Sequence, residues 1–278
     1  MARIFLWHGT LVRVKDSVIS NDARISYEVI GSGPDVVLLH AFPANREMWR
    51  PMAEMMADRY RLIMPDLRGH GESELGNGVA TMEKHAEDLR LVCVDADVNK
   101  AVFAGVSIGG YILFEFWRRH RARVRALVMA NTRASADTEE GRKTRLQSVD
   151  DVMRFGPEPF VEKMLEKVIG ETTRRNRPDI VGSARRMMLQ MPARAIAEVQ
   201  RGMAARPDSV ATLPTIDVPA LVIASDEDGT TPLKEAEIMR QGVRGAEMKV
   251  ISRVGHYAVF ERPDAVYELM APFLARQS

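Results

Sequence analysis

Residues 105–110 read GVSIGG, between the apolar segment KAVFA and the apolar segment YILFEFW. Ser107 is the centre of a G-x-S-x-G pattern, whose glycines remove side chains where a strand and a helix come closest. A turn this tight forces its central residue into a backbone conformation that residues other than glycine rarely adopt, and such strain usually persists where the side chain has a function. The stretch predicts a strand, a turn that presents the Ser107 hydroxyl, and a helix. An ordinary glycine-rich turn is the alternative, which the apolar flanks disfavour.

Short apolar runs recur along the chain, a pattern typical of parallel strands covered on both faces. They occupy residues 35–41, 60–66, 100–105, 124–131, 220–226 and 247–253. Helical patterns lie at 46–58, 81–96, 107–120, 232–243 and 263–277. Alternation of strands and helices implies right-handed crossovers, and therefore predicts an α/β fold with a mostly parallel, twisted sheet flanked by helices.

Two regions depart from this alternation. Residues 2–14 and 23–30 alternate polar and apolar side chains around the turn-prone SND, which predicts an antiparallel pair of strands at a sheet edge. Residues 133–213 contain helical patterns, at 157–170, 177–191 and 192–205, without a convincing strand. We interpret them as a helical cap insertion between a first core segment, 1–132, and a second core segment, 214–278.

Composition excludes several classes of function. The 278 residues suit one domain with a large core, and a net charge of +1 gives no reason to expect a nucleic acid or a membrane as partner. The single cysteine, Cys93, cannot form an internal disulfide. Neither a metal-ligand motif nor a phosphate-binding glycine loop occurs, so no metal and no cofactor is predicted. The apolar run near the N-terminus has only four residues, which predicts a soluble, cytoplasmic protein.

A serine hydroxyl needs a base within hydrogen-bond reach and a carboxylate that orients the base. Among six histidines, His256 follows the last apolar run and precedes the last helix, where a loop at the carboxyl end of a sheet presents its side chain. Asp226, Glu227 and Asp228 follow the preceding apolar run, and each is a candidate for the acid. The order serine, acid, histidine is that of one hydrolase architecture.

Five segments, taken in order, resemble the motifs of the α/β-hydrolase fold family, particularly its branch of 3-oxoadipate enol-lactonases, arylesterases and cofactor-free haloperoxidases or perhydrolases. They are HAFPANREMW (40–49), DLRGHGES (66–73), GVSIGG (105–110), SDEDGTTP (225–232) and GHYAVFERPDAV (255–266). The resemblance covers most of the chain outside the insertion and implies the fold of that family, with a small ester or lactone as substrate.

The resemblance also assigns roles. Ser107 becomes the nucleophile and His256 the base, while the position four residues before Pro232 selects Asp228 as the acid, with Asp226 as the fallback. The backbone N–H groups of Phe42 and Ile108 become the oxyanion hole.

The residues near the oxyanion loop have supporting roles in the same resemblance. His40 is expected to support that loop, and His70 is expected to be structural. Ala41 stands where many family members have glycine, a departure from the family pattern that bears on the direction of the Phe42 N–H.

The function implied is hydrolysis of a small carboxylic ester or lactone through an acyl-enzyme intermediate. Two alternatives stay open: perhydrolysis or carbon–carbon bond hydrolysis with the same three side chains, and a binding protein of this fold without catalysis. Arg133, Arg145 and Arg154 are candidates to meet an acidic lactone, although solvated surface charge is the commoner role of arginine. The sequence leaves the acyl group and the oligomeric state open.

Overall fold

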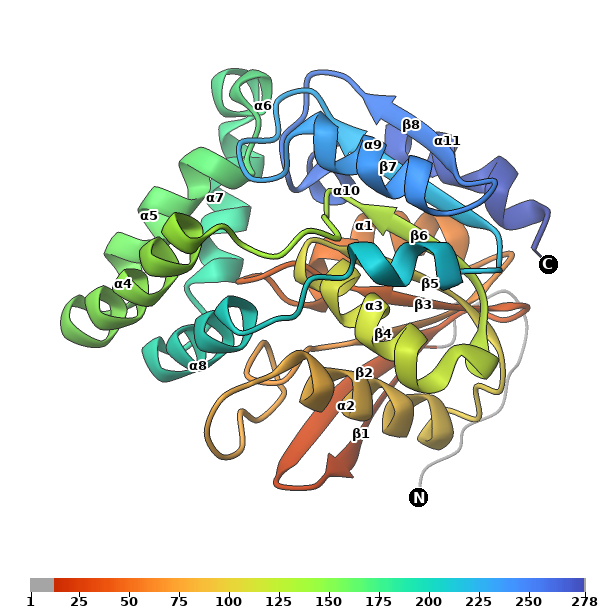
Figure 1. Cartoon of the computed structure of the whole chain (residues 1–278), viewed down its shortest axis with the longest axis horizontal. Coiled ribbons are helices and arrows are strands. Elements are labelled where there is room, and N and C mark those ends of the chain that lie inside the picture. The colour runs from red at the N-terminus through yellow and green to blue at the C-terminus, as the bar shows by residue number, and fades with distance from the viewer. Residues whose placement is uncertain (1–12, 278) are drawn as a thin grey trace.

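One eight-stranded sheet organises residues 13–277, the part of the chain that this computed structural model describes (Figure 1). The strand order is β1-β2-β4-β3-β5-β6-β7-β8. The β1–β2 and β2–β4 pairs are antiparallel, and every later pair is parallel. The strands are β1 (Arg13–Ser20), β2 (Ala23–Ile30), β3 (Asp35–Leu39), β4 (Arg61–Pro65), β5 (Ala101–Val106), β6 (Val124–Ala130), β7 (Ala220–Ser225) and β8 (Glu247–Ile251).

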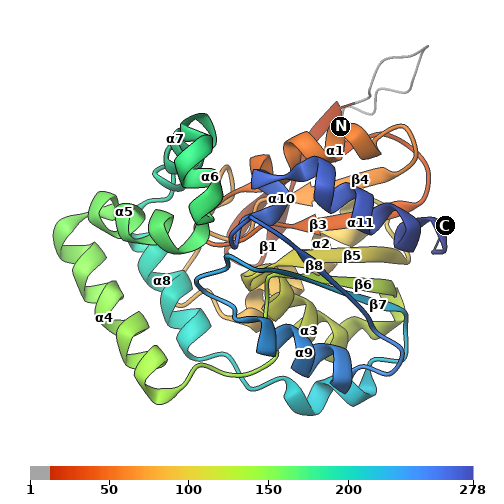
Figure 2. The same cartoon turned by 90° about the horizontal axis from the view of Figure 1, so that it is seen from above.

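Helices cover both faces of the sheet, as Figure 2 shows from above. Helices α2 (Met82–Asp95), α3 (Ile108–His120) and α9 (Leu233–Gly242) pack on one face. Helices α1 (Arg50–Met56), α10 (Ala258–Glu261) and α11 (Pro263–Ala275) pack on the other. Short 3₁₀ turns complete the core, namely η1 (Arg46–Trp49), η2 (Arg121–Arg123) and η3 (Val210–Thr215).

Burial on both faces explains the continuous apolar runs in the sequence. In β5, Phe103 points into the apolar cluster with α2 and α3, whereas Val102 and Ala104 point into the cluster with α1 and α11. Because successive side chains of a strand point to opposite faces, such a strand has no polar face. The predicted α/β fold with its mostly parallel sheet is confirmed.

The N-terminal strand differs from the prediction. The strand that pairs with β2 is Arg13–Ser20, so of the predicted strand at 2–14 only its last two residues belong to β1, and residues 1–12 lie outside the described part. Most side chains of β1 are exposed and several are charged, as expected of an edge strand that avoids pairing with other chains. The apolar pattern of the sequence therefore did not locate the strand Arg13–Ser20. The predicted antiparallel pair is nevertheless present at the sheet edge.

Five helices lie between β6 and β7, and we call them the insertion helices. Both views place them together beside the sheet (Figures 1 and 2). They are α4 (Glu139–Phe155), α5 (Pro157–Val168), α6 (Glu171–Asn176), α7 (Pro178–Met188) and α8 (Ala193–Ala204). The sequence patterns had located α5, α7 and α8 but neither α4, whose buried side chains are few, nor the short α6. No helix within residues 13–277 has the length and apolarity that crossing a membrane requires.

Candidate active site

Ser107 occupies a strained turn between β5 and α3. Its backbone has φ 55° and ψ −113°, a conformation that costs a residue with a side chain about 1–3 kcal/mol. The neighbouring glycines are required, because a Cβ on Gly105 would lie 2.5 Å from the backbone of Gly109, and a Cβ on Gly109 would lie 2.8 Å from the oxygen of Leu39. The Thr132 hydroxyl donates a hydrogen bond to the Ser107 carbonyl at 2.7 Å. The predicted strand–turn–helix unit is therefore present.

His256 and Asp228 meet at the ends of β7 and β8. The imidazole Nδ1 lies 2.8 Å from Oδ2 of Asp228, and both side chains are almost completely buried. The two residues follow neighbouring parallel strands, whose carboxyl ends meet at one edge of the sheet. Because Nδ1 faces the carboxylate, Nε2 is the nitrogen left to accept a proton.

Asp228 is held as an anion by several donors. Its oxygens accept hydrogen bonds from the backbone N–H groups of Thr230 and Thr231 at 2.7 and 2.9 Å, and from the Asn131 amide at 2.9 Å. Burial alone would favour the protonated acid, but the charge of His256 and the hydrogen bonds from His256, Thr231 and Asn131 outweigh it. Together they hold the pKa of Asp228 well below its usual range.

The other two candidate carboxylates, Asp226 and Glu227, are hydrogen-bonded to other segments of the chain. Asp226 accepts a hydrogen bond from the backbone N–H of Arg253 at 2.7 Å. Glu227 accepts hydrogen bonds from the N–H of Thr172 at 2.8 Å and from the Thr172 hydroxyl. Of the three candidates for the acid, Asp228 is thus the one that the fold brings to His256.

The loop with Phe42 is braced from two sides. The Tyr257 hydroxyl donates a hydrogen bond to the Phe42 carbonyl at 3.0 Å. The His40 ring bridges two loops, because its Nε2 accepts from the N–H of Leu67 at 2.9 Å and its Nδ1 lies 2.8 Å from the carbonyl of Ala41. Burial lowers the pKa of His40 to about 3, so the ring is neutral and Nδ1 donates.

Three further side chains near this loop are buried. Ala41 lies in an apolar cluster that accommodates its methyl group. The His70 ring is fully buried and stacks edge-on against Phe42, in keeping with a structural role. Ile108 is the first residue of α3, where a backbone N–H has no acceptor within the helix.

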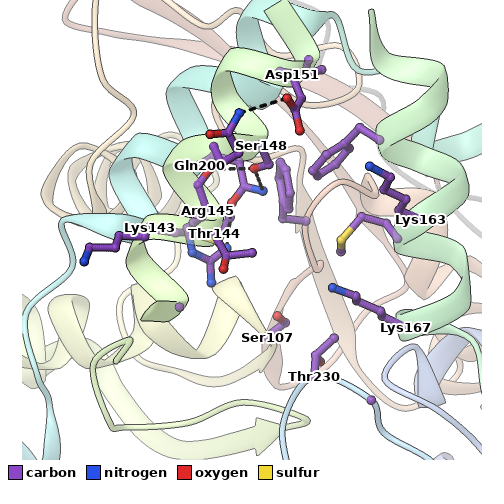
Figure 3. A pocket seen from close by; sticks show the side chains of 18 of the residues that line it. Ser107, Lys143, Thr144, Arg145, Ser148, Asp151, Lys163, Lys167, Gln200 and Thr230 are labelled. Atoms are coloured by element: carbon purple, nitrogen blue, oxygen red, sulfur yellow. Dashed lines mark hydrogen bonds between the residues drawn. The ribbon is translucent and has the colours of Figure 1, made fainter. Parts of the chain in front are cut away.

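A cavity of about 1080 Å³ brings these elements together (Figure 3). Ser107, His256, Phe42 and Thr230 line it from the loops at the strand ends, and α4, α5 and α8 line it from the insertion. The volume is in the range of small-molecule sites. Within residues 13–277 no group of three or more His, Cys, Asp or Glu side chains is arranged to hold a metal ion.

Sequence reasoning missed the polar side chains that orient the acid and the base. The Thr230 hydroxyl lies 2.8 Å from Oδ1 of Asp228 and 2.6 Å from Nδ1 of His256, and Asn131 joins Asp228 to Ser225. The two threonines that stand two and three residues after Asp228 carried a signal, since Asp and Thr side chains bond backbone groups two or three residues on. Asn131 carried a weaker one, as a polar residue that ends a buried strand.

Comparison with known proteins identifies the family of this chain. A family model described as alpha/beta hydrolase fold matches residues 34–263. The chain belongs to the α/β hydrolase fold family.

Relatives within this α/β hydrolase family include esterases and lactonases. The chain is similar to a thermophilic esterase from Thermogutta terrifontis, whose structure has malate bound, with 35% identity, a TM-score of 0.90 and coverage of 97% of this chain and 99% of that one. It is 24% identical to 3-oxoadipate enol-lactonase 1 of Acinetobacter baylyi over 87% of this chain and 89% of the relative. The fold also matches an enol-lactonase from Burkholderia xenovorans, with a TM-score of 0.87, 23% identity and coverage of 94% and 100%.

Proposed function

We propose that the protein is a serine hydrolase that cleaves a small carboxylic ester or lactone through an acyl-enzyme intermediate. The observation that carries the proposal is the Asp228–His256 pair, joined at 2.8 Å, in the cavity that Ser107 also lines. A serine on a strained turn, an imidazole and an ionised carboxylate are the groups that acyl transfer needs. The esterase and lactonase relatives support the substrate class.

In the proposed first step, the Ser107 Oγ attacks the carbonyl carbon of the substrate. Nε2 of His256 takes the hydroxyl proton, and the imidazolium that forms is stabilised by Asp228 through Nδ1–H. The negative charge passes to the carbonyl oxygen, which accepts hydrogen bonds from the backbone N–H groups of Phe42 and Ile108. When the tetrahedral intermediate collapses, the imidazolium returns its proton to the leaving alcohol.

In the second step, water attacks the acyl-enzyme. His256 accepts a proton from the water, and the same two N–H groups stabilise the second tetrahedral intermediate. The acid is then released and Ser107 regains its proton. In this proposal residues 133–213 form a cap that closes the cavity, while the core segments 1–132 and 214–278 carry the reacting groups.

Labelling with a fluorophosphonate probe tests the nucleophile. The wild-type protein is expected to be labelled at Ser107, and Ser107→Ala is expected to be unlabelled while it keeps the wild-type circular dichroism spectrum. Equal labelling of both proteins, or of neither, would overturn the proposal.

A substrate panel tests the reaction. Aryl esters graded by acyl chain length are compared with a set of lactones, and Ser107→Ala serves as the blank. We expect turnover of esters, lactones or both, with loss of at least about 10⁴-fold in the blank. Turnover confined to acetate with hydrogen peroxide would favour a perhydrolase instead.

A further inference from the structure

Helix α5 separates its charges onto two faces. Glu158 and Glu162 point away from the cavity and form ion pairs with Arg185 of α7 at 2.5 and 2.6 Å. Lys163 and Lys167, one turn apart, line the cavity instead. We call these two residues the lysine pair.

Figure 3 shows both lysine side chains extending from α5 into the cavity, with Lys167 on the side of Ser107 and Thr230. The end of α5 also touches the acid loop, because a Cβ built on Gly229 would lie 3.0 Å from the carbonyl oxygen of Lys167. One positive charge therefore lies on the side of the reacting groups, and the other lies one helical turn farther from Ser107, toward the end of the cavity where Asp151 lies (Figure 3).

The lysine pair has no counter-ion. Within residues 13–277 neither ammonium group takes part in an ion pair or a hydrogen bond. Like charges four residues apart on a helix repel each other, so an anion between them would relieve an unfavourable interaction. Arg145, by contrast, is engaged by Asp137 at 2.8 Å.

The other charges of the cavity do not cancel the lysine pair. Arg133 donates a hydrogen bond to the carbonyl of Thr230, which adds positive charge near the cavity floor. The acidic side chains of the lining, Glu140 and Asp151, both belong to α4. Asp151 accepts a hydrogen bond from the Gln147 amide at 3.1 Å and lies toward the end of the cavity away from Ser107 (Figure 3).

Apolar side chains flank the lysine pair. Phe160 and Met164 share the cavity face of α5 with the lysine pair. A surface that alternates apolar and cationic side chains complements an aliphatic chain that ends in an anion.

We propose that the lysine pair binds a carboxylate on the acyl part of the substrate, so that the enzyme prefers half-esters of dicarboxylic acids or lactones that carry a carboxyl group. This inference rests on the proposed function of the same cavity. A carboxylate on the acyl part keeps its contact with the lysine pair through both steps, and so holds the reacting carbonyl in place. A carboxylate on the alcohol would lose that contact when the alcohol leaves.

Matched esters test the preference. The kcat/KM for para-nitrophenyl hydrogen adipate is compared with that for para-nitrophenyl hexanoate, which has the same chain length and no charge. The wild-type enzyme is expected to favour the adipate ester about tenfold, and Lys167→Met and Lys163→Met to lower that ratio about three- to tenfold each. The hexanoate rate is expected to change less than about twofold. Added salt is expected to lower the ratio of the wild type and not that of a variant that carries both Lys163→Met and Lys167→Met.

Lys143→Met is the control variant. Lys143 also lines the cavity, but Figure 3 shows its side chain directed away from it, so its replacement is expected to leave the ratio unchanged. A wild-type ratio near one, or a loss with Lys143→Met as large as with Lys167→Met, would overturn the proposal while hexanoate hydrolysis still supported a serine esterase.

Binding to an inactive variant separates the two proposals. Calorimetry on Ser107→Ala is expected to show tighter binding of monomethyl adipate than of methyl hexanoate, and Lys167→Met in that background is expected to remove the difference. Equal binding of the two esters contradicts the carboxylate site whether or not the wild-type enzyme hydrolyses either. Preferential binding without hydrolysis by the wild type supports the carboxylate site and refutes the esterase.

Discussion

The floor and the roof of the cavity are held in different ways. The floor consists of the loops that carry Ser107, Asp228 and His256. Hydrogen bonds shorter than 3 Å join Asp228 to His256 and to Asn131, and another joins the Thr132 hydroxyl to the Ser107 carbonyl. The roof consists of the insertion helices α4, α5 and α8, where the lysine pair has no partner within the described residues and Phe155 is 59% exposed. A hydrogen-bonded floor suits chemistry, which tolerates little displacement, and a roof that carries the unpartnered lysine pair suits selection among substrates.

The buried carboxylate of Glu261 connects the floor and the roof. Glu261 accepts hydrogen bonds from the N–H groups of Gly170, beside the roof, and Gly255, beside His256, both at 3.0 Å. The N–H of Tyr257 bonds to the carbonyl of Val168 at the end of α5, also at 3.0 Å. A change at this junction should therefore affect both regions, whereas changes within one region should remain local.

The largest effect is expected in the floor. Asp228→Asn should lower kcat/KM for a neutral aryl ester about 10⁴-fold, because an amide cannot stabilise the imidazolium and favours the wrong tautomer of His256. Asp226→Asn is the matched control, since Asp226 bonds the N–H of Arg253 instead. The assignment of the acid is wrong if Asp226→Asn costs more than Asp228→Asn.

Lowering the pH should remove the stability that the ionised Asp228 contributes. Because the pKa of Asp228 is lowered in the folded state, its contribution is complete above its unfolded pKa of about 3.9 and is lost as the pH falls toward the folded value. The unfolding free energies of wild type and Asp228→Asn should differ by about 2 kcal/mol more at pH 6 than at pH 2 to 3. Urea titrations at several pH values measure this, and a pH-independent difference would show that the carboxylate is not stabilised as an anion.

A substitution at the junction between floor and roof should have an intermediate effect on stability and activity. Glu261→Gln replaces one acceptor oxygen with a donor that faces a backbone N–H, which should cost about 1–3 kcal/mol in urea unfolding and reduce kcat through the loop of His256. Glu237→Gln, on the exposed surface of α9, is the control and should leave both quantities unchanged. If Glu261→Gln alters neither, the floor and the roof are not coupled through this carboxylate.

The smallest effect is expected in the roof. Phe160 packs edge-on against Phe42 with ring centroids 5.8 Å apart, so Phe160→Leu should change the relative kcat/KM of long and short acyl esters about three- to tenfold. Labelling by a fluorophosphonate should be unaffected. Leu146→Ala, an exposed residue of α4, is the control. A loss that is equal for all acyl chains would mean that Phe160 supports the floor.

Local sequence patterns were sufficient to predict much of the cavity floor. The strand–turn–helix context of Ser107 could be predicted because the glycines, the apolar strand and the apolar helix are adjacent in the sequence. Five of the six parallel strands were located because burial on both faces leaves continuous apolar runs, whereas β8, at the sheet edge, is partly exposed. Helix α4 was not predicted, because its buried side chains are too few for a clear helical period.

The sequence by itself determined the type of fold, the strained serine turn and the three consecutive carboxylates from which the acid would come. The family resemblance selected Asp228 among them, but only the tertiary structure shows that carboxylate beside His256, and only it decided which charges of α5 face the cavity while others pair with α7. The reason is physical: a strand or a helix is set by the spacing of neighbouring residues, but an ion pair or a cavity wall depends on how distant segments pack.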